Sequence, residues 1–164
     1  MFMSILVAEV MNRWSHTFED SSLSAEDFYT KLQKVLEGQQ MPNTTINRAT
    51  HKEGGMFSSS REYLRVKHRD LVFDICAAPF GKNFFISWWL YETAGTMQRL
   101  LKNTKVGDVL KTRAANKTFF EIDSEQMFRE CVHDCVMLAV TAEAESKGFR
   151  QLTDAEKQYK EGGI

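Results

Sequence analysis

Hydrophobic positions along the chain recur at two different spacings. Between residues 24 and 38 the spacing is helical, and Ser24 opens this stretch with Asp27 three residues later, close to a capping box. Gly38 stands where a C-cap is expected. The apolar stripe consists of Phe28, Leu32, Val35 and Leu36. The pattern predicts a helix over residues 24–38.

The N-terminal residues, MFMSILVAEVMNRW, also have helical spacing. The positions that recur are Met3, Val7, Val10 and Trp14. A signal peptide is not favoured, because no basic region comes first and Glu9 interrupts the apolar run. We expect a helix over residues 1–14 that docks on the core, followed by a polar connection over residues 15–23. A helix that touches a partner or a membrane is the alternative.

After Pro42 the pattern changes to a period of two. Four runs are rich in β-branched and aromatic residues, which is typical of strands. They cover residues 44–50, 57–68, 71–78 and 83–91. Turns are expected at residues 53–55 and 79–82, where glycine and proline gather. Because short turns join successive runs, the pattern predicts an antiparallel meander.

The last part of the chain returns to helical spacing. Residues 118–122 fit a short strand or an extended lead-in, and Asp123 and Gln126 then form a capping box. We expect a long helix from there to Lys147, closed by Gly148. Its centre is apolar on more than one side, so the helix is expected to lie buried across the sheet.

Together these elements predict one α+β domain over residues 1–164. It is an antiparallel four- to five-stranded meander packed against a long C-terminal helix and an N-terminal helical segment. The helical segment covers residues 1–40, the β-meander 43–92, a polar loop with a short helix 93–117, and the long helix with a short tail 118–164. Thr153 and Glu156 form a capping box for a short helix in that tail.

Composition narrows the classes of function. The chain has 21 basic and 22 acidic residues and a formal net charge of -1, so its overall charge does not favour nucleic acid as a partner. An odd count of 3 cysteines argues against a disulfide scaffold and favours a cytoplasmic location. No run of 18 apolar residues exists, so no transmembrane segment is expected.

One face of the predicted sheet carries the candidate chemistry. A tight turn at residues 69–70 places Arg65 opposite Asp74, on the face away from the apolar residues. A four-residue turn at 79–82 would then place Ser87 beside Asp74. The predicted ligand-binding residues on this face are Arg61, Tyr63, Arg65, Lys67, Asp74, Ser87 and Trp89.

This face has two interpretations. The first is structural: Arg65 and Asp74 form an ion pair that fixes the register of a half-covered sheet. The second is a pocket with aromatic walls and a few polar groups, suited to a planar or anionic small ligand. In that case Arg61 and Arg65 would hold an anionic group, and Tyr63 and Trp89 would stack on a planar one.

The spacing Cys131, His133, Cys135 resembles a set of metal ligands but does not form one. On a helix Cys131 and Cys135 share a face, whereas His133 points away from them, so the three cannot converge on one ion. Two thiolates do not complete a zinc site, and core thiols are the simpler interpretation. His133 is expected to face solvent or to join a polar cluster with Asp134. No metal site, cofactor motif or nucleophile–base pair is predicted.

Several blocks of the sequence resemble a family of small uncharacterised bacterial proteins. The blocks are residues 54–58 (GGMFS), 61–66 (REYLRV), 73–81 (FDICAAPFG), 84–90 (FFISWWL) and 118–128 (TFFEIDSEQMF), followed by Val132-His133 and an end centred on Gly148. They span most of the chain, and FDICAAPFG is the most specific. The family has no assigned activity, so the resemblance implies no catalytic residue.

The chain departs from that family between the two halves. Family members carry an apolar hairpin there, of a kind associated with membranes. Here residues 93–117 are rich in basic side chains, a composition that cannot lie in hydrocarbon. They include Lys102, Lys105, Lys111, Arg113 and Lys117. A soluble relative is therefore expected.

The leading functional hypothesis is a non-enzymatic binding or interaction module of bacterial or phage origin, whose partner is a small anionic ligand or a protein. A self-assembling protein that uses the apolar N-terminus and the Trp88-Trp89 pair is the alternative. A third hypothesis is an enzyme in which Asp74 acts as general base, which requires a buried carboxyl with a raised pKa and no neutralisation by Arg65.

Overall fold

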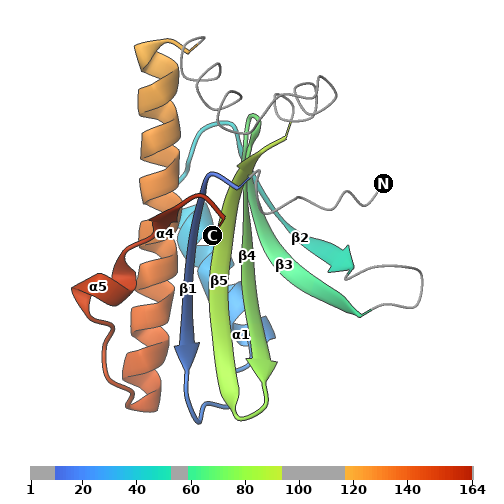
Figure 1. The fold of residues 1–164 in the computed structure, drawn as a ribbon, viewed down its shortest axis with the longest axis vertical. Helices are drawn as coiled ribbons and strands as arrows, with labels where there is room; N and C mark the ends of the chain where they lie inside the picture. Colours follow the sequence, from blue (N-terminus) through green and yellow to red (C-terminus); the bar gives the residue numbers. More distant parts are fainter. Residues whose placement is uncertain (1–9, 53–58, 94–116, 164) are drawn as a thin grey trace.

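The computed structural model describes residues 10–52, 59–93 and 117–163. In chain order the elements are β1 (Asn12–Phe18), α1 (Ala25–Gly38), β2 (Thr44–Lys52), β3 (Ser60–His68), β4 (Leu71–Phe80), β5 (Asn83–Glu92), α4 (Phe119–Lys147), α5 (Asp154–Lys157) and β6 (Lys160–Glu161). The strands form one sheet in the order β2-β3-β4-β5-β1-β6, with antiparallel neighbours throughout (Figure 1). The predicted meander is confirmed as β2 to β5, and β1 and β6 extend it to six strands.

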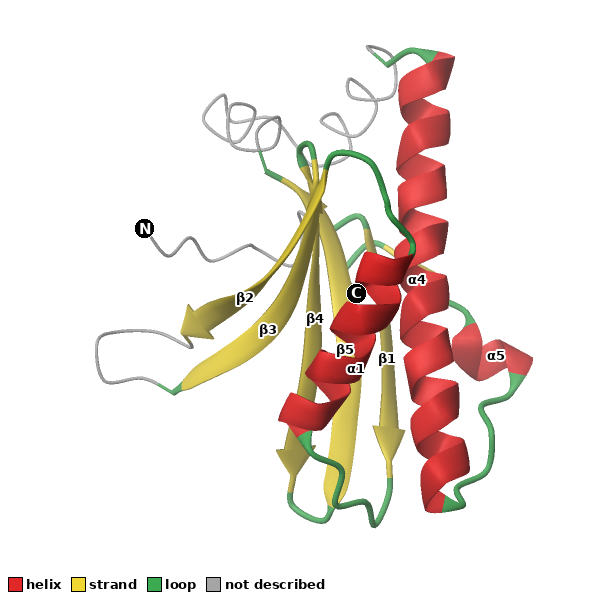
Figure 2. Cartoon of the chain, turned by 180° about the vertical axis from the view of Figure 1, so that it is seen from behind, coloured by secondary structure: helices red, strands yellow, loops and turns green. Residues whose placement is uncertain are grey.

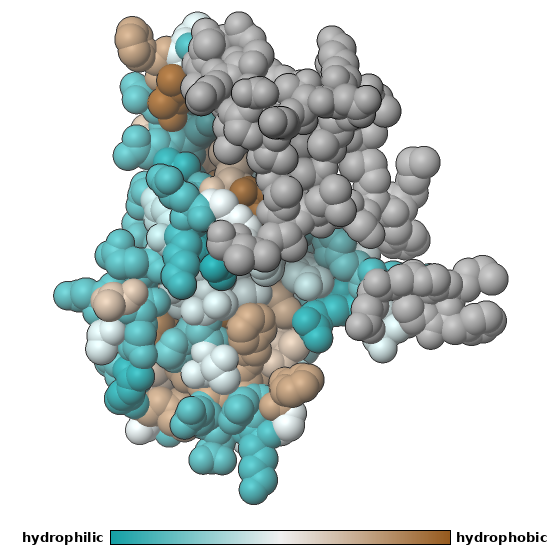
Figure 3. All heavy atoms as spheres, viewed as in Figure 1, coloured by the Kyte–Doolittle hydropathy of each residue, from teal (hydrophilic) through white to brown (hydrophobic). Residues whose placement is uncertain are grey.

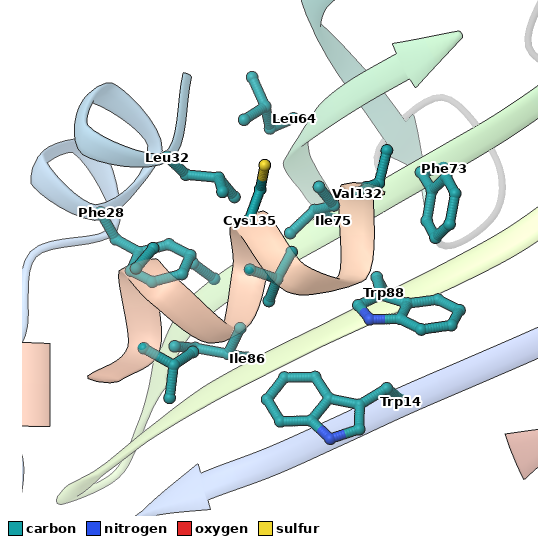
Figure 4. Close-up of a cluster of buried hydrophobic side chains, with 14 of the residues drawn as sticks. Trp14, Phe28, Leu32, Leu64, Phe73, Ile75, Ile86, Trp88, Val132 and Cys135 are labelled. Carbon is teal, nitrogen blue, oxygen red and sulfur yellow. The ribbon is translucent and has the colours of Figure 1, made fainter. Parts of the chain in front are cut away.

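Helices α1 and α4 cover one face of the sheet, which makes a two-layer α+β fold (Figure 2). The alternate apolar residues of β3, β4 and β5 that point toward the helices are buried from Leu64 to Val66, from Leu71 to Ala77 and from Phe84 to Leu90, as their pattern predicts. The core joins side chains from both helices and four strands (Figure 4). It includes Trp14, Phe28, Leu32, Leu64, Phe73, Ile75, Ile86, Trp88, Val132 and Cys135. No helix among the described residues has the length and hydropathy needed to span a membrane.

The N-terminal prediction is wrong where the structure can test it. Residues Asn12–Phe18 form β1 and not the end of a helix, and Ser15–Phe18 belong to this strand and not to a connection. The strand pairs with β5 along its whole length, and Trp14 and Phe18 enter the core at alternate positions. This pairing with a strand some seventy residues away outweighs the local helical spacing. Residues 1–9 lie outside the described residues.

The helix at residues 24–38 is confirmed, and its N-cap is Ser24, whose side chain accepts a hydrogen bond from the Asp27 backbone N–H. The C-cap is Gln39 and not Gly38, which lies within the helix. The positive φ of 51° falls on Gln40. Gly38 thus provides no left-handed cap.

Helix α4 begins earlier than predicted. Thr118 is its N-cap, and the side chains of Thr118 and Glu121 each bond the other residue's backbone N–H. This capping box precedes the predicted one at Asp123, so residues 119–122 are helical and not extended. The other end is confirmed: Gly148 closes α4 with a φ of 71°. The predicted capping box at Thr153 is also confirmed.

The predicted register is correct for the β3–β4 hairpin and shifted for the β4–β5 hairpin. Arg65 lies opposite Asp74, as predicted. At the next turn Phe80 pairs with Asn83, so only two residues form the turn, and Trp89, not Ser87, lies opposite Asp74. Gly81, at a φ of 60°, allows the tight turn. Because the shift is two residues, every side chain of β5 keeps its predicted face.

Strands β3 and β4 separate beyond the Leu64–Ile75 pair (Figures 1 and 2). The hydroxyl of Tyr29, from α1, lies at this split. It donates to the Glu62 carbonyl at 2.8 Å and accepts from the Ala77 N–H at 2.7 Å. A side chain thus satisfies backbone groups that the ladder leaves free. We call β2 and β3 together the β2–β3 arm.

His133 lies in the core, which corrects the expectation that it faces solvent or joins Asp134. Its Nδ1 accepts from the Trp88 indole N–H at 3.1 Å, and its Nε2 lies 2.8 Å from the Lys157 carbonyl oxygen, to which it donates. Burial lowers the pKa of His133, so the neutral ring is favoured. Cys135 is buried beside the sheet, and Cys131 is partly buried against the same cluster.

Candidate ligand-binding face of the sheet

The face of the sheet that points away from α1 and α4 carries an unusual set of polar side chains; we call it the outer face (Figure 1). Its residues alternate along the strands with those of the core. They include Thr45, Asn47, Ala49 and His51 of β2, Arg61, Tyr63, Arg65 and Lys67 of β3, Val72, Asp74 and Cys76 of β4, Phe85, Ser87, Trp89 and Tyr91 of β5, Arg13, Ser15 and Thr17 of β1, and Lys160 of β6. Hydrophobic and hydrophilic side chains are interspersed over these strands (Figure 3).

All seven predicted site residues lie on this face, but they do not form one group. Arg65 and Asp74 form the expected ion pair. Ser87 pairs with Cys76 and not with Asp74, so the predicted polar row through Ser87 is wrong in register. The observed row crosses all six strands, through Asn47, Arg65, Asp74, Trp89, Arg13 and Lys160. Lys67 is exposed at the edge of the set, next to Val72.

Asp74 is the centre of the outer face. Its side chain is 4% exposed and accepts hydrogen bonds from three residues. Arg65 donates Nε to Oδ1 at 2.8 Å and Nη2 to Oδ2 at 2.9 Å. The Tyr91 hydroxyl donates to Oδ2 at 2.6 Å, and His51 Nε2 lies 2.7 Å from the same oxygen. A buried carboxylate with this many donors is fully satisfied.

These donors keep Asp74 ionised. Burial by itself raises the pKa of the carboxyl, but the hydrogen bonds from His51, Arg65 and Tyr91 outweigh it and hold the pKa below its ordinary value. The hypothesis of a general base at Asp74 needs the opposite shift and a carboxyl free of Arg65. Neither condition is met. Asp74 instead holds its neighbours in place.

His51 is the main member of this group that the sequence pattern did not identify as a site residue. It lies four residues along β2 from Asn47, which faces Arg65 across the ladder. In a flat sheet its Cα would lie about 17 Å from that of Asp74, too far for the two side chains to meet. The observed contact requires the β2–β3 arm to bend toward the outer face. Alternation along β2 gives the face of His51, but the bend that brings it to Asp74 has no local signal.

Tyr91 was missed for a simpler reason. It follows Ser87 and Trp89 at the same period of two, but it stands at the end of the predicted strand. Its ring is buried, and burial raises the pKa of its hydroxyl, so Tyr91 remains a neutral donor to Asp74. The predicted run ends at residue 91, whereas β5 continues to Glu92, so Tyr91 lies inside the strand and not at its last position.

A second group lies around Cys76. Burial raises the pKa of the Cys76 thiol and also that of the Tyr63 hydroxyl, while the positive charge of Arg61 opposes both shifts. The Tyr63 ring packs edge-on against His51, with 4.9 Å between ring centres. The raised pKa favours the protonated thiol, which is a poor nucleophile.

The outer face is strongly basic although the chain as a whole is not. Among the outer-face residues the described strands place five cations against one carboxylate, Asp74. The cations are Arg13, Arg61, Arg65, Lys67 and Lys160. Arg13 has neither a hydrogen bond nor an ion pair among the described residues, and its Nε is buried without a partner. Trp89 lies directly opposite Arg13 and is half-buried, as are Tyr63 and Phe85.

No family model matches the chain, and no curated protein or solved structure matches it either. The side chains of the outer face are therefore the only guide to function among the described residues. A group of three or more His, Cys, Asp or Glu side chains placed to hold a metal ion would suggest metal chemistry, but the described part of the chain contains no such group.

Proposed function

We propose that the protein binds a small anionic ligand with a planar part on the outer face of its sheet. The observation that carries the proposal is the row Asp74–Trp89–Arg13. In it a half-buried indole lies between a satisfied carboxylate and a guanidinium that has no partner among the described residues. Because Nε is buried, the terminal nitrogens of Arg13 are the ones that a ligand can reach, and an anionic ligand supplies them with acceptors.

Two features support the planar part of the ligand. Trp89, Phe85 and Tyr63 leave part of each ring accessible on the same face as the cations. Aromatic faces beside arginine favour flat, electron-rich groups such as nucleobases. The ligand class is thus nucleotide-like: a ring to stack and a negative group to pair.

The test is a calorimetric titration with AMP, with adenosine as the uncharged comparison. We expect AMP to bind, adenosine to bind more weakly, and Arg13→Gln to weaken AMP about 10- to 100-fold through loss of one charge-assisted hydrogen bond. Lys34→Gln is the matched control, because Lys34 is an exposed cation on α1, on the other side of the sheet. Equal loss in both variants would mean that only overall charge matters. No heat with either compound, nor with a wider set of nucleotides, would refute the proposal.

Self-assembly is the second candidate, and a different surface supports it. Trp88 is fully buried, so the Trp88-Trp89 pair offers only Trp89. The start of α4, however, exposes Phe119 at 89% and Phe120 at 70%. Exposed aromatic pairs of this kind favour contact with another apolar surface. Light scattering at several concentrations, with Phe120→Ser for comparison, tests it: a monomer at every concentration would exclude self-assembly.

A further inference from the structure

One buried carboxylate holds His51 and Arg65 side by side on the outer face. Asp74 binds Nε and Nη2 of Arg65 and Nε2 of His51, and the last two nitrogens are 3.2 Å apart. Neither the second terminal nitrogen of Arg65, Nη1, nor the second ring nitrogen of His51, Nδ1, has a hydrogen bond to any described residue. Both side chains are about one-third exposed, at 32% and 30%. The pair is therefore rigid on its inner side and open on its outer side.

The contacts also decide which nitrogen of His51 carries a proton. The carboxylate of Asp74 is ionised and has no hydrogen to give, so the 2.7 Å contact requires a hydrogen on Nε2. Nδ1 is then the nitrogen that gains or loses a proton. In the neutral ring it presents a lone pair to the outer face, and in the imidazolium it presents an N–H donor.

We propose that His51 and Arg65 form a subsite for a dianionic oxyanion group, as in a sulfate or a phosphate ester, and that the subsite binds it only when His51 is protonated. A neutral ring would direct a lone pair at the ligand oxygen, whereas the imidazolium donates to Asp74 through Nε2 and to the ligand through Nδ1. Nη1 of Arg65 supplies a second donor. This inference rests on the proposed function and assigns the negative group of its ligand to a particular pair of residues.

The groups that face His51 are consistent with ligand binding that depends on its protonation. Asp74 of β4 stabilises the imidazolium, and Tyr91 of β5 donates to the same Asp74 oxygen. Arg65 of β3 opposes the protonation of His51, and so does Arg61, its partner across the ladder. The Tyr63 ring packs edge-on against the imidazole. A bound dianion offsets the repulsion between the cations, so its binding and the protonation of His51 favour each other.

Sulfate is the probe of choice, because it stays dianionic over the pH range in which histidine titrates. Its affinity is measured by NMR at about pH 5.5 and about pH 8, with ionic strength held constant by chloride. We expect sulfate to bind at least about tenfold more tightly at the lower pH, as for the gain of a charge-assisted hydrogen bond. The His51 ring resonances should shift on binding.

Two variants distinguish a specific role of His51 in sulfate binding from the general effect of positive charge on the outer face. His51→Gln keeps an amide N–H that can reach Asp74 in place of Nε2 but has no group equivalent to Nδ1, so it should bind sulfate weakly and equally at both pH values. Arg61→Gln, the control, removes a full charge from the residue opposite His51. It should weaken binding at both pH values but, unlike His51→Gln, still leave tighter binding at the lower pH.

The outcomes also distinguish this inference from the proposed function. If AMP binds but sulfate binding is independent of pH, or depends on pH equally in His51→Gln, the subsite is refuted and the outer-face ligand site stands. If sulfate shows the expected pH ratio and His51→Gln removes it, the subsite is supported. If neither AMP nor sulfate binds at either pH, both proposals fail.

Discussion

Replacement of Asp74 by asparagine should be one of the most damaging isosteric changes in this chain. The carboxylate accepts at Oδ2 from His51, Arg65 and Tyr91, and at Oδ1 from Arg65 Nε. Asparagine has one acceptor oxygen and one amide donor. Its least costly orientation places the oxygen at the Oδ2 position and turns the amide toward Arg65 Nε, which leaves two donors facing each other.

The magnitude follows from these contacts. One buried donor without an acceptor costs about 1–3 kcal/mol, and the remaining bonds lose their charge assistance. Removal of one partner from a buried ion pair costs about 3–5 kcal/mol. Since the Arg65 side chain is 32% exposed and regains some hydration, the lower end applies, and we expect Asp74→Asn to lower the free energy of unfolding by about 3 kcal/mol.

Urea denaturation at neutral pH measures the loss, and Asp134→Asn is the matched control. Asp134 is an exposed carboxylate in the middle of α4, so its replacement should change stability by less than about 0.5 kcal/mol. A value for Asp74→Asn within about 1 kcal/mol of the wild type would refute the view that this carboxylate organises the outer face.

The difference in unfolding free energy between wild type and Asp74→Asn should also depend on pH. The pKa of Asp74 is lowered in the folded state, so its contribution is fully present above the ordinary carboxyl pKa of about 3.9 and is lost as pH falls through the folded value. The stability gap between wild type and Asp74→Asn should therefore shrink in acid, as the pH falls below about 3.9. A gap that stays constant in acid would contradict the ionised pair.

Further predictions concern the rest of the fold. Tyr29→Phe removes the hydroxyl between Glu62 and Ala77 and should cost about 2–3 kcal/mol in urea denaturation, since two backbone groups lose their partner. Gly148→Ala should cost about 1 kcal/mol in thermal unfolding, because its φ is 71°, whereas Gly38→Ala, without a positive φ, should not destabilise. Burial lowers the pKa of His133, so the stability it confers is present above about pH 6.5 and falls as pH drops below that value. His133→Gln should flatten this part of the pH–stability curve, and an unchanged slope would contradict the buried neutral ring.

Much of the fold can be predicted from local signals in the sequence. The turn at Arg69 and Asp70 sets the register of β3 and β4, and strict alternation assigns the two faces of the sheet even where the register was shifted by two residues. β1 is harder, because Asn12–Phe18 is short and mostly polar on its outer side, and its partner β5 is distant in the chain. The residues before β1 are rich in methionine and other apolar side chains at helical spacing. Their spacing dominates the local pattern.

The candidate site also has a part that the sequence predicts and a part that depends on the three-dimensional fold. The face of Arg61, Tyr63, Arg65 and Trp89 follows from alternation alone. The contact of His51 with Asp74 depends on how far the sheet bends, which is a property of all its strands together. Arg13, whose guanidinium has no partner in the described part of the chain, faces Trp89 only because β1 pairs with β5. A helix over this segment, as the local pattern predicts, would not place Arg13 on the outer face.

The split between β3 and β4 divides the outer face into two parts. Only five residue pairs join the β2–β3 arm to β4, whereas ten join β4 to β5. His51 and Arg61 belong to the arm, while Asp74, Trp89 and Arg13 belong to the larger part. The arm is thus the part of the sheet expected to open first in amide hydrogen exchange, hinged where Tyr29 of α1 bridges the gap. A ligand that contacts both parts would hold them together, and its binding should slow amide hydrogen exchange along β3.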